Sequence, residues 1–144
     1  MPKSTICEPA TSLPRKLGLL TASVGNLNVA LMGEPAEFQS QLGDLPATVR
    51  FGSHIQPDTN LAICFVRSLL ELNTLFELLA TQLPPKASVW IARPKQHGKP
   101  GFNEHHVRDG GLALGLVDYK ICSFNDDWSG IKFTWRREAP GKKT

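Results

Sequence analysis

The stretch Leu61-Ala62-Ile63-Cys64-Phe65-Val66 decides the fold, because six apolar residues in a row are typical of a strand covered on both faces. A helical pattern follows at once, with Ser68 and Glu71 at the spacing of a capping box. Apolar residues then recur at steps of three and four: Leu69, Leu72, Phe76, Leu79 and Leu83. This pattern predicts a helix that ends before Pro84-Pro85, since proline removes a helical hydrogen bond.

Two further apolar runs lie on either side of this strand and helix. Val89-Trp90-Ile91-Ala92 provides the next strand, and Val29-Ala30-Leu31-Met32 provides an earlier one. Thr48-Val49-Arg50-Phe51 alternates polar and apolar residues, which favours a shorter strand nearer a sheet edge. A short helix beginning near Pro35 is expected between the strands over residues 29–32 and 48–51. Because continuous apolar runs are typical of parallel strands, we expect a mostly parallel sheet with helices on both faces.

The C-terminal third is predicted to contain a helix and an antiparallel hairpin. Asn103 can cap a helix that runs towards Leu114. Gly110-Gly111 weakens this helix by about 1 kcal/mol per glycine and favours a break there. Residues 117–122 and 131–136 alternate apolar and polar side chains on either side of a polar turn, which is the pattern of a hairpin.

Together these elements predict one α/β domain of the three-layer Rossmann-like class, with a mostly parallel sheet, helices on both faces and a C-terminal antiparallel hairpin. The chain has 144 residues, of which 41% are apolar and 20% are charged, and these values are ordinary for one globular domain. We expect a flexible arm over residues 1–11, the domain over 12–137 and a flexible tail over 138–144.

Cysteine usage and the length of the apolar runs indicate a cytoplasmic protein. The three cysteines form no CxxC pair, and Cys64 and Cys122 lie within strand patterns, so we expect packed thiols rather than disulfides. No apolar run is long enough to cross a bilayer, and the N-terminus lacks the apolar segment of a secretory signal. We therefore expect no contact with a membrane.

The order of the elements resembles the class I methyltransferase sheet, in which helix-linked apolar strands are followed by a terminal antiparallel hairpin. The resemblance covers roughly residues 29–137. Four motifs are also similar to those of a small bacterial family that is classed as a domain of unknown function: Lys16-Leu17-Gly18, Pro94-Lys95, Gly115-Leu116-Val117-Asp118-Tyr119-Lys120 and Trp128-Ser129-Gly130-Ile131-Lys132-Phe133. The resemblance implies a fold but no reaction.

The turns after the first two strands depart from the methyltransferase pattern. A nucleotide cofactor in such a fold needs a glycine-rich turn after the first strand and an acidic residue at the end of the second. Here the first turn is Gly33-Glu34-Pro35-Ala36, which has one glycine and a proline that removes a donor. The second strand ends in Phe51-Gly52-Ser53-His54, which contains no acid. We therefore expect no cofactor.

Basic residues gather between Arg93 and Arg108, directly after a parallel strand. Open α/β sheets bind ligands at the carboxyl ends of their strands, and a helix capped by Asn103 would direct its N-terminal amides into the same crevice. Guanidinium groups and amides together favour a small anionic or nucleotide ligand. The predicted ligand contacts are Arg93, Lys95, His97, Lys99, His105 and Arg108. Further loop contacts are predicted at Trp128, Ser129 and Lys132. The alternative is a solvated basic loop that keeps the protein soluble.

The other polar clusters in the sequence are assigned neither a metal nor a catalytic role. His97, His105, His106 and Asp109 match no established metal-binding spacing, so no metal is expected. Asp126-Asp127 lies among turn-forming residues and fits turn chemistry better than paired acid and base roles. Because there is also no GxSxG motif, we assign no catalytic residue.

Three functions remain open at this point. The first is a non-catalytic binding or regulatory domain with a degenerate methyltransferase-like fold, which takes an anion or nucleotide at the carboxyl edge of the sheet. The second is an S-adenosylmethionine (SAM)-dependent methyltransferase or another small-molecule enzyme. The third is a protein-interaction adaptor that works as a homodimer or with a protein partner. Nucleic acid is not expected as a partner, because a net charge of +3 is too small to indicate it.

Overall fold

The computed structural model describes residue 17 and residues 27–36, 38–42, 48–95, 104–125 and 127–136. The expected N-terminal arm and C-terminal tail lie outside these residues. Within them, the chain forms six strands and three helices in the order β1 (Leu27–Met32), α2 (Phe38–Leu42), β2 (Val49–Gly52), β3 (Leu61–Phe65), α3 (Leu69–Gln82), β4 (Ser88–Pro94), α4 (Glu104–Leu114), β5 (Leu116–Ser123) and β6 (Trp128–Trp135).

All six strands belong to one sheet, whose order is β2-β1-β3-β4-β6-β5. The pairs β1–β2, β1–β3 and β3–β4 are parallel, and β6 runs antiparallel to both β4 and β5. The two most apolar runs of the sequence are neighbours in this sheet, since Ile63 of β3 pairs with Trp90 of β4. The prediction of a mostly parallel sheet that ends in an antiparallel hairpin is confirmed.

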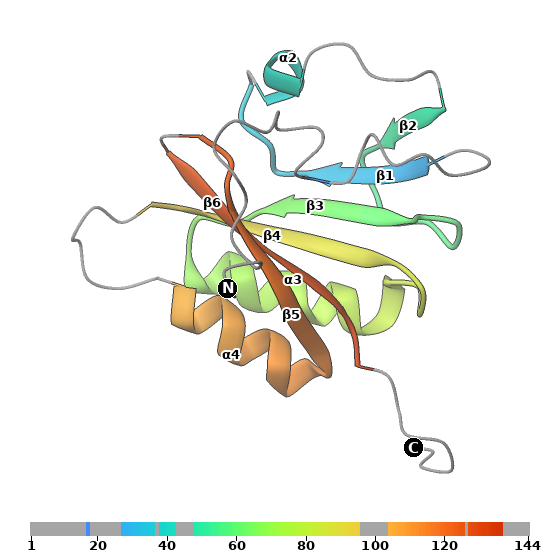
Figure 1. The fold of residues 1–144 in the computed structure, drawn as a ribbon. Coiled ribbons are helices and arrows are strands. Elements are labelled where there is room, and N and C mark those ends of the chain that lie inside the picture. The colour runs from blue at the N-terminus through green and yellow to red at the C-terminus, as the bar shows by residue number, and fades with distance from the viewer. Residues whose placement is uncertain are drawn as a thin grey trace, which may run out of the picture.

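Helices cover both faces of the sheet, as the sequence predicted (Figure 1). On one face, α3 and α4 bury Leu72, Leu79 and Val107 against a core that includes Val89 and Ile91. On the other face, α2 packs with a second core cluster: Leu17, Val29, Leu31, Phe38, Leu42, Leu61, Ile63, Phe65, Trp90, Ala92, Cys122 and Phe124. The alternation of buried side chains along each central strand therefore supplies two cores, one on each face.

The start of α3 follows from its sequence. The Ser68 hydroxyl accepts a hydrogen bond from the Glu71 amide at 3.2 Å, which caps the helix. The Glu71 carboxylate in turn accepts from the amide of Arg67 at 2.8 Å, one residue further back than in the usual capping box. Leu69, expected on the buried stripe, lies in the first turn and is 42% exposed. The N-terminal end of α3 therefore leaves apolar surface uncovered.

The expected break at Gly110-Gly111 is wrong, because α4 runs without interruption from Glu104 to Leu114. A Cβ atom added at Gly110 would lie 2.3 Å from the ring of Phe76, and one added at Gly111 would lie 2.5 Å from the ring of Phe133. The missing side chains allow α4 to approach α3 and the sheet closely. Tertiary packing thus outweighs the low helix propensity of glycine.

Replacing Gly111 by alanine is therefore expected to lower the free energy of unfolding by about 1–3 kcal/mol, because the new methyl group overpacks the core at Phe133. Helix propensity alone would predict the opposite, a gain of about 1 kcal/mol. Urea unfolding measures the difference. Ala113→Gly, at an exposed position of the same helix, isolates the propensity effect. A Gly111→Ala variant as stable as the wild type would contradict the packing argument.

The hairpin turn is held by Asn125. Its side-chain oxygen accepts hydrogen bonds from the amides of Asp127 at 2.8 Å and Trp128 at 2.9 Å. This is an Asx turn, which agrees with the prediction of turn chemistry for this segment. The strand β6 begins at Trp128, three residues earlier than the alternating pattern that starts at Ile131 indicated.

The connection between β2 and β3 is short and contains no helix. Only residues 53–60 join the two strands, whereas parallel strands usually need a crossover of a dozen residues or more. Ile55 packs this loop onto the core under α3, and the Asn60 amide donates to the Asn28 carbonyl near the start of β1. The loop therefore covers the amino-terminal part of β1, and Met32 at the other end stays only partly buried.

Candidate functional site

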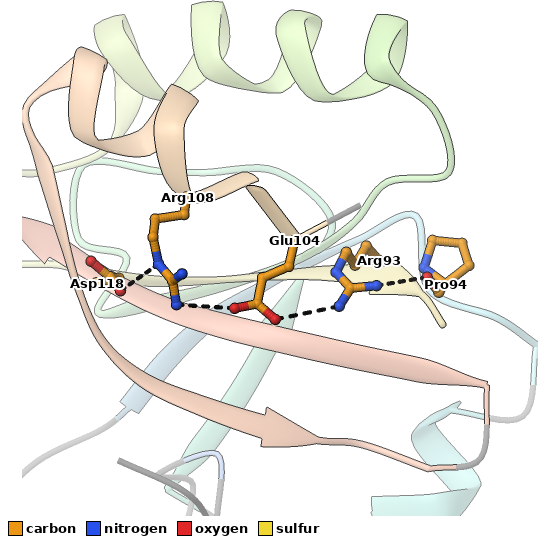
Figure 2. A network of polar contacts seen from close by, with 5 residues as sticks. All are labelled: Arg93, Pro94, Glu104, Arg108 and Asp118. Carbon is orange, nitrogen blue, oxygen red and sulfur yellow. Dashed lines mark hydrogen bonds and ion pairs between the residues drawn. The ribbon is translucent and has the colours of Figure 1, made fainter. Parts of the chain in front are cut away.

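The two arginines of the predicted anion site are engaged in a network of ion pairs (Figure 2). Arg93 lies 3.6 Å from the Glu104 carboxylate, and Arg108 lies 3.0 Å from the same carboxylate. Arg108 also donates to Asp118 at 3.1 Å, and Arg93 donates to the carbonyl of Pro94 at 3.1 Å. Two guanidinium groups thus face two carboxylates, and the network ties α4 to β4 and β5.

The remaining predicted ligand contacts lie apart from this network or outside the described residues. The Lys95 ammonium donates to the Ser123 hydroxyl at 2.7 Å, next to the turn of the hairpin. His105 is exposed on α4. His97 and Lys99 lie outside the described residues. The structure brings Arg93 and Arg108 into one network, in which Glu104 pairs with both and Asp118 pairs with Arg108. Anion binding here stays a prediction.

The three predicted loop contacts have separate positions on β6. Trp128 packs edge-on against Phe65, with ring centroids 5.0 Å apart. Ser129 pairs with Arg93 across the β4–β6 ladder. The Lys132 ammonium lies 5.8 Å from the ring centroid of Trp90. Trp128 and Ser129 lie at the carboxyl end of β4, whereas Lys132 lies beside the middle of that strand.

Neither described cysteine has the properties of a nucleophile. Cys64 and Cys122 are both buried and form no disulfide. Burial raises the pKa of the Cys64 thiol to about 12, so the thiol stays protonated at neutral pH. Among the residues that the structure describes, no three His, Cys, Asp or Glu side chains are grouped as metal ligands.

The topological switch point of the sheet lies between β1 and β3. The chain leaves β1 towards β2 on one side, and the later strands are added on the other side. Ligands of open α/β sheets bind in the crevice outside the carboxyl ends of these two strands. Here Gly33, with φ of +73°, follows β1 directly, and a Cβ atom on it would lie 2.7 Å from the carbonyl oxygen of Phe65. The backbones at the two strand ends are therefore in close contact.

On the α2 face, an aromatic cluster occupies the space beyond these strand ends. We define the aromatic cluster as Phe38, Phe65, Phe124 and Trp128. The ring of Phe65 lies 4.8 Å from that of Phe38 and 5.9 Å from that of Phe124, measured between centroids. All three phenylalanines are buried. This side of the crevice is filled by side chains of the protein itself.

On the α3 face, the same strand ends leave a pocket of about 430 Å³, which we call the switch-point pocket. Its residues come from the ends of β1 and β3 and from one side of α3: Met32, Gly33, Cys64, Phe65, Val66, Leu70, Glu71, Thr74, Leu75 and Leu78. Glu71 is the one ionisable carboxylate among them, and the Thr74 hydroxyl already donates to the Leu70 carbonyl at 2.9 Å. Leu70, at 76% exposure, is the most exposed large apolar side chain among the described residues.

The surroundings of the switch point do not fit SAM. The turn after β1 lacks the glycine-rich pattern that lets a nucleotide cofactor approach the backbone. At the end of β2, where an acid would hold the ribose hydroxyls, Ser53 and His54 hydrogen-bond to each other at 3.1 Å. The switch-point pocket itself offers mainly aliphatic side chains to the adenosine and methionine groups.

The sequence contained a signal for the switch-point pocket that the periodicity argument did not use. The buried stripe of α3 accounts for Leu72 and Leu79, but Leu70 and Leu78 are leucines outside it, spaced two helical turns apart. Leucines outside the buried stripe of a helix indicate a second apolar contact. The short loop over residues 53–60 was a second signal, because it is too short for a covering helix.

The sheet order, the helices on both faces and the C-terminal hairpin define the chain as a Rossmann-like α/β protein with a methyltransferase-like fold. The solved ribosomal protein L11 methylase from Lactobacillus delbrueckii subsp. bulgaricus matches 88% of this chain and 75% of its own, with TM-score 0.52 and 11% identity. A putative type 11 methyltransferase from Sulfolobus solfataricus matches 83% of this chain and 90% of its own, with TM-score 0.50 and 8% identity. At such identities the likeness concerns the fold alone.

Other comparisons add little to this assignment. The chain spans about half the length, 47%, of the solved complex of LepI with SAM, which matches at TM-score 0.48 and 13% identity. No family model matches the chain. Among the described residues, no helix has the length and apolar character needed to span a membrane.

A sequence similarity to β2-microglobulin disagrees with the fold. The protein of Saguinus oedipus is 32% identical over 87 residues, which cover 52% of this chain and 73% of the relative. β2-Microglobulin is a sandwich of antiparallel sheets. The present chain instead forms one sheet with three parallel strand pairs and covering helices. These hydrogen-bond registers are incompatible with a sandwich, so we assign the chain by its fold.

Proposed function

We propose that the protein is a non-catalytic binding domain that holds a small, largely apolar ligand in the switch-point pocket. The observation that carries the proposal is an apolar pocket at the one place where open α/β sheets bind ligands, next to a turn that lacks the glycine-rich pattern of a nucleotide site. Neither described cysteine is exposed, and the pocket contains no pair of acid and base.

The size and composition of the pocket support a small molecule. Its volume of about 430 Å³ falls within the usual range of small-molecule sites, which are mostly apolar with a few polar groups. Leu70 lines the pocket, and most of its side chain is exposed to water. A ligand that covered Leu70, Met32 and Leu78 would gain about 25 cal/mol for each Å² of apolar surface removed from water.

The anion predicted from the sequence is less favoured as the ligand. To reach Arg93, an anion would have to compete with Glu104, and to reach Arg108 it would have to compete with both Glu104 and Asp118. The positive charge that would attract the anion is cancelled within the network. We therefore place the ligand in the switch-point pocket, at the same carboxyl edge of the sheet but under α3.

Leu70→Ser tests this proposal. With 1-octanol as the probe, the variant is expected to bind about fivefold more weakly than the wild type, which corresponds to about 1 kcal/mol of lost apolar contact. Titrations followed by the methyl NMR signal of Met32 measure the affinity and its location. Leu69→Ser is the matched control, because Leu69 is also exposed on the first turn of α3 but does not line the pocket.

Two other results would overturn the proposal. Octanol that leaves the Met32 signal unchanged at millimolar concentration means that the pocket binds no apolar ligand. A wild-type dimer that becomes a monomer in Leu70→Ser, seen by size exclusion with light scattering, means that a second copy covers Leu70. That result would favour the adaptor function.

The similarity of the fold to two methylases favours a second candidate, a SAM-dependent methyltransferase. It requires saturable binding of SAM or S-adenosylhomocysteine, which isothermal titration calorimetry measures directly. Binding with a stoichiometry near one would establish this candidate and overturn the non-catalytic proposal. We expect no heat of binding, because the aromatic cluster fills the α2 side of the crevice and the end of β2 lacks the acid that would hold the ribose.

A further inference from the structure

We infer that the ligand of the switch-point pocket carries a positive charge, such as a protonated amine on an apolar body, and that Glu71 recognises this charge. The inference rests on the proposed function, because it concerns the polar end of a ligand in the same pocket. Glu71 is the sole charged residue among those that line the pocket. A ligand that fills the aliphatic part of the pocket therefore meets a carboxylate.

The carboxylate of Glu71 is held in place and belongs to none of the three ion pairs among the described residues. One of its oxygens accepts a hydrogen bond from the Arg67 amide at 2.8 Å, which orients the group at the start of α3. The second oxygen is left to accept from a ligand. A carboxylate that accepts from an ammonium group forms a charge-assisted hydrogen bond, which is stronger than one between neutral groups.

The nearest basic side chain along the chain is engaged elsewhere. The guanidinium of Arg67 lies over the ring of Trp128, 5.0 Å from the ring centroid, in the geometry of a cation–π contact. Arg67 does not line the pocket. The Thr74 hydroxyl, the other polar group of α3 in the pocket, donates to the Leu70 carbonyl and adds no charge. The charge offered to a ligand is therefore negative.

Three probes with the same chain test the inference: octylammonium, 1-octanol and octyl sulfate. Octylammonium is expected to bind about two- to fivefold more tightly than octanol at low salt, because an exposed carboxylate is screened by water. Octyl sulfate is expected to bind most weakly. The advantage of octylammonium should shrink in 0.5 M salt, where the Debye length is only a few ångströms. Calorimetry measures the affinities, and the Met32 methyl signal reports the site.

Glu71→Gln removes the charge and keeps the structure. A glutamine oxygen can still accept from the Arg67 amide, so the cap of α3 is retained. The variant is expected to bind octylammonium and octanol equally. Glu77→Gln is the matched control, because Glu77 is exposed on the same helix and does not line the pocket. It should keep the preference for octylammonium.

The possible failures are distinguishable. If octanol binds in the pocket and octylammonium binds no more tightly, the inference is wrong while the proposed function stands. Tighter binding of octyl sulfate would also overturn the inference and would point to the amides at the start of α3 as the polar contact. If none of the three probes shifts the Met32 signal, the proposed function fails and the inference fails with it.

Discussion

Trp90→Ala is expected to lower the free energy of unfolding by about 3–5 kcal/mol, the usual range for truncating a large aromatic side chain in a core. Trp90 is 0% exposed and lies in the middle of the sheet, where its ring packs edge-on against Phe124 with centroids 5.5 Å apart. Its indole nitrogen donates to the carbonyl of Leu17 at 3.1 Å. The substitution therefore leaves a cavity and also a buried carbonyl without its partner.

The variant Trp90→Phe separates these two effects. It keeps an aromatic ring in the core but loses the hydrogen bond to Leu17, so we expect a smaller loss of about 1–3 kcal/mol. Urea unfolding of both variants gives the comparison. A Trp90→Ala protein within about 1 kcal/mol of the wild type would show that this part of the core can collapse around the missing ring.

Gly33→Ala is expected to cost about 2–4 kcal/mol and to abolish binding of octanol in the switch-point pocket. Part of the cost arises because φ at Gly33 is +73°, a conformation that residues with a side chain rarely adopt. The rest arises because the new methyl group would lie 2.7 Å from the Phe65 carbonyl oxygen, which belongs to rigid backbone. To relieve this contact, the ends of β1 and β3 must separate, and the pocket changes shape.

Gly52→Ala is the control for Gly33→Ala. Gly52 also ends a strand, but the nearest atom to an added Cβ is the His54 carbonyl oxygen at 4.0 Å. We expect its stability to remain within about 0.5 kcal/mol of the wild type, as for other surface substitutions. If both variants lose the same stability, the contact between Gly33 and Phe65 is not the cause.

In the function proposed above, a methyltransferase-like fold binds a ligand without a nucleotide cofactor. The sheet keeps the switch point between β1 and β3, but the aromatic cluster fills the α2 side of the crevice beyond it. The short loop between β2 and β3 leaves the opposite side open over Met32. The proposed site is therefore open because no crossover helix lies between β2 and β3, and it does not depend on a residue motif alone.

Much of the fold was predictable because it depends on local patterns. Continuous apolar runs predicted β1, β3 and β4, and the Ser68 cap with its helical stripe predicted α3. Alternation predicted β5 and β6 as a hairpin. These patterns reflect burial, which acts through the spacing of side chains along one segment. The break predicted at Gly110-Gly111 failed because helix propensity is a weak effect beside the packing of α4 on Phe76 and Phe133.

The sequence placed the predicted ligand contacts after β4, whereas the switch-point pocket lies at the ends of β1 and β3. The sequence gathered Arg93 and Arg108 in one segment but did not reveal that Glu104 pairs with both and that Asp118 pairs with Arg108. Such pairing depends on how α4 packs against β4 and β5. The position of a charged residue in the sequence does not show which oppositely charged residue lies next to it in the fold. The switch-point pocket was missed for the same reason, since its wall combines residues from β1, β3 and α3.

By itself, then, the sequence determined the α/β class, the parallel strands, the hairpin and the lack of a glycine-rich cofactor turn. Each of these follows from neighbours along the chain, for which the period of apolar residues is sufficient evidence. Only the tertiary structure decided that the basic residues are neutralised and that an apolar pocket with one carboxylate lies beneath α3. Pockets and ion pairs are formed by residues far apart in the chain, and their positions are set when the helices pack on the sheet.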